Sequence, residues 1–98
     1  MYIVINGPGM LFGIFSSKKY MRIAIEQKIK DAIETNDKPC GNFHFRYIKV
    51  KPNEPWFSED GEYHSEVGKA LFSLSTMHTE AFPNEVETDW TTGKIIKL

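Results

Sequence analysis

The chain contains 98 residues, of which 41% are hydrophobic and 26% charged, with twelve Lys and Arg against thirteen Asp and Glu. This length fits one domain, which we take to span residues 1–98. The apolar share excludes a disordered chain, and the net charge of −1 excludes a uniformly basic nucleic-acid binder. Cys40 is the only cysteine, which excludes an intramolecular disulfide, and no run of about 18 apolar residues is present. No basic residue precedes Lys18, which argues against a secretion signal, so we expect a cytoplasmic protein.

The first fifteen residues predict two strands joined by a turn. Residues 1–5 and 10–15 are rich in residues that favour strands, and Asn6-Gly7-Pro8-Gly9 between them is dense in turn formers. The simplest interpretation is a β-hairpin.

A helix is predicted from Lys18 to about Glu34, a stretch without Gly or Pro. Ser16 or Ser17 can cap its start, because a serine hydroxyl accepts an otherwise unpaired backbone N–H. Pro39 prevents its continuation beyond the loop that follows. At helical spacing, one apolar stripe predicts the buried face: Met21, Ile25, Ile29, Ala32 and Ile33, with Ala24 at its edge.

Most of the remaining chain predicts strands. In the segment 42–50, Phe43, Phe45 and Tyr47 point to one side. The other predicted elements are a hairpin turn at Asp60-Gly61, either a helix over 66–74 or a strand over 71–77, a loop over 79–84, and strands over 85–90 and 94–98. This order indicates an α+β fold, with a largely antiparallel sheet of four to six strands and one long amphipathic helix packed on one face.

Two segments near the start of the helix have features of an anion-binding site. Residues 7–13 are rich in glycine, but Ile14-Phe15 stands where a phosphate-binding loop needs Lys followed by Ser or Thr. Ser16-Ser17-Lys18-Lys19 offers hydroxyl and ammonium groups beside helix N–H groups, a combination that suits a phosphate or carboxylate. A small phosphate-ligand-binding domain or enzyme is therefore one alternative.

No catalytic or metal-ligating motif is present. His44, His64 and His78 are far apart, whereas zinc needs three or four converging ligands. Cys40 lies in a Pro39-Cys40-Gly41 turn, and no serine has the sequence context of a nucleophile elbow. We expect no enzyme, no metal and no cofactor.

A second alternative is an RNA- or DNA-binding domain. Phe43, Phe45 and Tyr47 have the alternate spacing with which strand aromatics stack on bases. The residues that would bind nucleic acid, or an anion, are Ser17, Lys18, Lys19, Arg22 and Arg46, with Lys49 and Lys51 adding charge.

Charge is distributed unevenly along the chain. Residues 1–51 carry a net of +5 and residues 52–93 a net of −8. Within the segment 54–66, aromatic and acidic side chains alternate closely, which suits a surface that binds a basic protein partner. The predicted partner-binding residues are Trp56, Phe57, Glu59, Asp60, Glu62 and Tyr63.

The first third of the chain, in which Gly13-Ile14-Phe15-Ser16-Ser17 leads into an amphipathic helix, resembles small uncharacterised bacterial and phage domains. Those domains have a strand, a G-I-[FY]-S-S turn, a helix and a further strand, here residues 43–50, so the resemblance covers about half the chain. It brings no catalytic residues. The small size, the single domain and the abundance of Lys, Asn, Phe and Met also resemble an accessory protein of a large phage, a class that often binds and disables one host protein. The leading expectation is therefore a non-enzymatic interaction protein, with protein as the partner.

Overall fold

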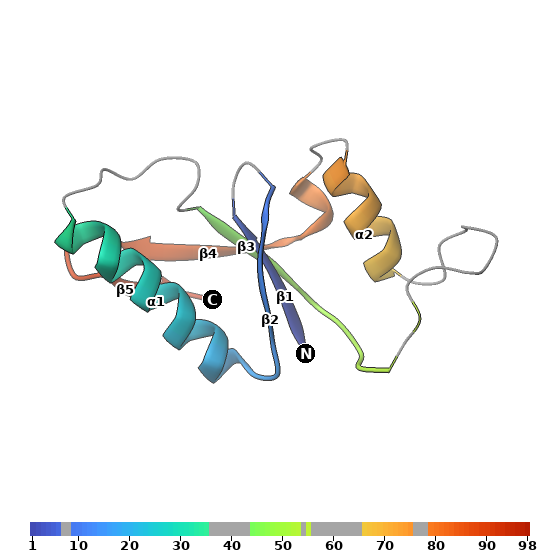
Figure 1. The fold of residues 1–98 in the computed structure, drawn as a ribbon, viewed down its shortest axis with the longest axis horizontal. Coiled ribbons are helices and arrows are strands. Elements are labelled where there is room, and N and C mark those ends of the chain that lie inside the picture. Colours follow the sequence, from blue (N-terminus) through green and yellow to red (C-terminus); the bar gives the residue numbers. More distant parts are fainter. Residues whose placement is uncertain (7–8, 36–43, 54, 56–65, 76–78) are drawn as a thin grey trace.

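The computed structural model describes residues 1–6, 9–35, 44–53, 55, 66–75 and 79–98. These residues form one five-stranded antiparallel sheet in the order β2-β1-β3-β4-β5, together with two α-helices (Figure 1). The predicted α+β class is confirmed. In chain order the elements are β1 (Tyr2–Asn6), β2 (Leu11–Phe15), α1 (Lys18–Glu34), β3 (Phe45–Lys49), α2 (Glu66–Ser75), the 3-10 turn η2 (Thr79–Ala81), β4 (Asn84–Asp89) and β5 (Lys94–Lys97).

The strands β1 and β2 form the predicted hairpin. Asn6 closes its turn from two sides, because its N–H donates to the Met10 carbonyl at 2.9 Å and its Oδ1 accepts the Met10 N–H at 3.1 Å. Gly9 has a φ of 106°, which a side chain would disfavour. The helix starts only after β2, so residues 7–13 do not end at a helix N-terminus, where a phosphate-binding loop would have to end.

Helix α1 agrees with the predicted apolar stripe. Ser17 is its N-cap, and the Ser17 hydroxyl accepts the Tyr20 N–H at 3.3 Å. Met21, Ile25 and Ile29 are fully buried against the sheet. Burial of each such side chain stabilises the fold by roughly 1.5–3 kcal/mol, so this stripe is what attaches α1 to the sheet.

Strand β1 is buried on both faces of the sheet, and strand β3 is buried on the face toward α1. In β1, Val4 faces α1, whereas Ile3 and Ile5 belong to a second apolar cluster on the opposite face. In β3, Phe45 and Tyr47 face α1, as their spacing predicted. A strand with two covered faces is apolar along its whole length, which is the pattern of β1.

The predicted architecture placed one long helix on one face of the sheet and left a second helix open as one of two alternatives, and the structure has two helices. Residues 66–75 form α2, the helical one of the two structures predicted for that region. Ala70 of α2 and Phe82, which follows η2, are buried with Ile3 and Ile5 on the face opposite α1. The sheet therefore lies between two helical layers, because the apolar side chains of β1 on this face also need a cover.

A tight turn joins β4 to β5, the two predicted C-terminal strands. Gly93 in this turn has a φ of 77°. The Asp89 carboxylate accepts the Thr91 N–H at 2.8 Å, and hydrogen bonds of this kind lower the pKa of Asp89, the bond from the Thr91 backbone most of all.

This hydrogen bond predicts a pH dependence of stability. Because the pKa of Asp89 is lower in the folded chain than in the unfolded one, its contribution is present at neutral pH and is lost as the pH falls below about 4. Asp89→Asn keeps an acceptor oxygen but cannot titrate. We expect the free energy of unfolding, measured in urea between about pH 2 and 6, to fall more steeply for the wild type than for this variant. Parallel curves would contradict the expectation.

Candidate interaction surfaces

The predicted acidic and aromatic surface lies outside the described residues. All six of its members, from Trp56 to Tyr63, fall in the range 56–65. Cys40 and Phe43 are likewise outside the described part, as are His64 and His78. The structure therefore tests only the other candidate surfaces, which are formed by the basic residues and by the aromatic residues of β3.

The predicted basic residues fall into two groups. Ser17, Lys18, Lys19 and Arg22 lie in the first turns of α1, where the Ser17 hydroxyl is occupied as the cap and Arg22 lies 4.0 Å from Glu26. Arg46 instead points to the opposite face of the sheet, because its neighbours in β3, Phe45 and Tyr47, face α1. The fold thus separates Arg46 from the four helix residues.

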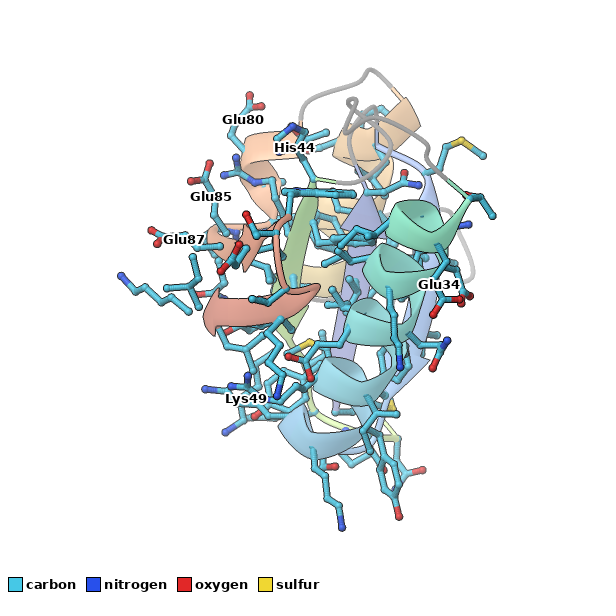
Figure 2. The ribbon with its side chains drawn as sticks, turned by 90° about the vertical axis from the view of Figure 1, so that its left-hand side faces the viewer. Glu34, His44, Lys49, Glu80, Glu85 and Glu87 are labelled. Carbon is cyan, nitrogen blue, oxygen red and sulfur yellow. The ribbon has the colours of Figure 1, made fainter. Side chains whose placement is uncertain are left out.

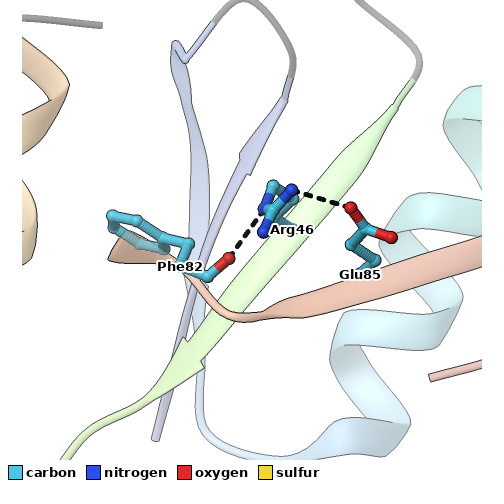
Figure 3. Close-up of polar contacts among 3 residues, drawn as sticks. All are labelled: Arg46, Phe82 and Glu85. Carbon is cyan, nitrogen blue, oxygen red and sulfur yellow. Dashed lines mark hydrogen bonds and ion pairs between the residues drawn. The ribbon is translucent and has the colours of Figure 1, made fainter. Parts of the chain in front are cut away.

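Arg46 connects strand β3 to the chain that follows η2 (Figure 3). Its Nε donates to the Phe82 carbonyl at 2.7 Å, and its Nη1 lies 2.8 Å from Oε1 of Glu85. Glu85 is also the register partner of Arg46 in the adjacent strand. A guanidinium bound in this way is held by the protein itself, and this contact accounts for the position of Arg46 without a ligand.

The aromatic side chains of β3 belong to the core. Phe45 is 2% exposed and Tyr47 is 4% exposed, and both lie under α1. The Phe45 ring packs edge-on against Phe12 with centroids 5.0 Å apart, and Tyr47 packs against Tyr2 at 5.8 Å. Stacking on nucleic-acid bases needs exposed rings, so these two residues cannot supply it.

Folding mixes the acidic and basic parts of the chain along β4. Glu85 pairs with Arg46 of β3, while Glu87 and Asp89 lie opposite Lys97 and Lys94 of β5. Glu80, Glu85 and Glu87 project from the same side of the molecule as His44 (Figure 2). Among the described residues, part of the acidic charge of the segment 52–93 is thus compensated by neighbouring cations.

A hollow of about 610 Å³ opens beside β4. Among the described residues, no group of three or more His, Cys, Asp and Glu side chains could hold a metal ion. Every buried side-chain nitrogen or oxygen described has a hydrogen-bond partner. In this described part, no buried polar side-chain atom is left for a ligand to satisfy. The hollow is lined by His44, Arg46, Glu85, Glu87, Trp90 and Ile96, among others.

The edge strand β2 carries an exposed apolar surface that the sequence-based predictions missed. Leu11 is 58% exposed and Ile14 47% exposed, and Met10 just before the strand is 63% exposed. The strand has no charged residue, whereas β5 at the other edge of the sheet has Lys94 and Lys97. Lysine on an edge strand discourages pairing with another chain, and β2 lacks this protection.

The sequence shows that β2 is apolar and uncharged, but it does not show that this strand lies at the edge of the sheet. The β1 and β2 segments, YIVIN and LFGIF, are similar in composition. Only their places in the sheet distinguish them, since β1 has a neighbour on each side and β2 on one side.

Comparisons with known proteins add no relative: no family model matches the chain, nor does any curated protein sequence or solved structure. The described residues contain no helix of sufficient length and apolar character to cross a membrane.

Proposed function

We propose that this protein is a non-enzymatic interaction protein that acts by binding another protein chain. The observation that carries the proposal is the uncharged apolar edge β2, where Leu11 and Ile14 are half exposed and where, among the described strands, only β1 is a pairing partner. An open strand edge is a template for an extended segment of protein, because its N–H and C=O groups continue the ladder of the sheet.

A second surface of the same proposal is the segment 54–66. Its aromatic residues would serve as anchors, and its carboxylates would orient a basic partner and speed the encounter. The resemblance of the first half to small phage domains supports a host protein as the target. The single cysteine supports a reducing cytoplasmic location.

Two charge variants test the proposal by affinity capture from nuclease-treated lysate of the cells that express the gene. The first replaces Glu59, Asp60 and Glu62 by lysine, and the second replaces Leu11 and Ile14 by lysine. We expect a defined protein to bind the wild type, and the dissociation constant of that complex to rise on the order of tenfold or more in at least one variant.

Ile96→Lys is the matched control, because Ile96 is 67% exposed on the opposite edge strand. Its dissociation constant should match that of the wild type. Unchanged binding by both charge variants would contradict the proposal. Capture from untreated lysate alone, with a steep dependence on salt, would instead favour the nucleic-acid alternative.

A further inference from the structure

Strand β2 contains an irregularity that restricts which strand can pair with its open edge. The register between β1 and β2 shifts between Val4↔Gly13 and Ile5↔Leu11, which leaves Phe12 as an extra residue in β2. This is a β-bulge, and a bulge interrupts the alternation of side chains between the two faces of a sheet.

The contacts of β1 and of the core clusters define the face of each β2 residue. Leu11 and Ile14 are register partners of Ile5 and Ile3, which belong to the cluster on the α2 side. Gly13 is the partner of Val4, on the α1 side, and Phe12 packs against that same α1-side cluster. From residue 11 to residue 14 the faces are therefore α2, α1, α1, α2, an order that is the same in both directions.

We propose that the open edge of β2 pairs antiparallel with β2 of a second copy of this chain. A regular strand alternates strictly, so its faces cannot match this order along all four residues. A second β2 carries the same bulge and matches it when Leu11 lies opposite Ile14 of the other copy and Phe12 opposite Gly13. The pairing is two-fold symmetric, as a closed dimer requires.

Side-chain size and charge agree with this register. The exposed pair Leu11 and Ile14 would cover each other twice across the interface, and the Phe12 ring would lie opposite a glycine. Lys18 and Lys19, which follow β2, would lie at opposite ends of the paired strands because the strands run antiparallel. Pairing of two β2 strands rests on the proposed function of this edge as a binding site, and it identifies the partner as a second copy of the chain.

The test is the mass of the purified protein in sedimentation equilibrium over roughly three orders of magnitude of concentration. We expect a monomer–dimer equilibrium in the wild type and in Ile96→Lys. Leu11→Lys and Ile14→Glu should each weaken the dimer about tenfold, since symmetry makes each substitution act twice. Thermal unfolding of each variant verifies that it is folded.

Mixing the variants tests the register itself. Leu11→Lys in one copy would lie opposite Ile14→Glu in the other, so the mixture should form a heterodimer tighter than either homodimer. A mixture of Leu11→Lys with Leu11→Glu is the matched control, because position 11 does not meet position 11, and it should gain no such preference. If only the control mixture preferred the heterodimer, the register that places Leu11 opposite Ile14 would be overturned.

A wild type that stays monomeric at every concentration would overturn the inference. The proposed function would survive that result if the Leu11 and Ile14 variant still lost a captured protein partner, because β2 would then bind a foreign strand. Both proposals for this edge fail if neither assay responds to changes in β2.

Discussion

Phe45→Ala is expected to lower the free energy of unfolding by about 3–5 kcal/mol. Phe45 is 2% exposed, and strand β3 holds it between Asn6 of β1 and Val86 of β4. Its ring contacts Phe12 under α1. Small domains are stable by only about 5–15 kcal/mol, so the loss is a large share of the total. Urea denaturation followed by circular dichroism measures it.

Phe72→Ala is the control of the same chemical type. Phe72 lies in α2 and is 51% exposed, so its replacement should cost at most about 1.5 kcal/mol. Similar losses for the two variants would show that Phe45 is not the more buried side chain. In that case burial would no longer exclude the Phe45 ring from stacking on nucleic-acid bases.

The second large effect is expected from Ile25→Ala in helix α1. Ile25 is fully buried against the sheet, and its replacement leaves a cavity that costs about 2–5 kcal/mol. For a domain of this size, each kcal/mol shifts the melting temperature by roughly 4–8 °C. Thermal unfolding should therefore show a clear decrease.

Ile23→Ala provides a matched comparison within the same helix. Ile23 is 54% exposed, and the gain in helix propensity from Ile to Ala is similar at both positions. The difference between the two variants thus measures burial alone, and we expect Ile25→Ala to cost at least about 2 kcal/mol more. A difference below about 0.5 kcal/mol would contradict the orientation of the helix.

The local elements of this fold could be predicted from the sequence because their signals are local. The apolar stripe Met21, Ile25 and Ile29 recurs at helical spacing, and the structure buries all three. Asn6 and Gly9 mark the turn between β1 and β2. The alternation of Phe45 and Tyr47 with Arg46 predicted which side chains of β3 share a face.

The candidate surfaces depended on contacts between residues far apart in the chain. Arg46 was a candidate for binding nucleic acid until the fold placed Glu85, 39 residues away, within 2.8 Å of its guanidinium. The sequence alone did not decide between a helix and a strand for the region that forms α2. Ile3 and Ile5, on the face of β1 opposite α1, need an apolar cover, and this need favours the helix.

Length, composition and charge by themselves predicted one small domain without an intramolecular disulfide, and they showed that residues 1–51 and 52–93 carry opposite net charge. Only the tertiary structure decided that β4 lies between cations of β3 and β5, which mixes those halves, and that β2 lies at an open edge. The physical reason is that side-chain periodicity specifies which face of an element is buried. The neighbours of a strand follow instead from the order of pairing in the sheet, which joins segments distant in sequence.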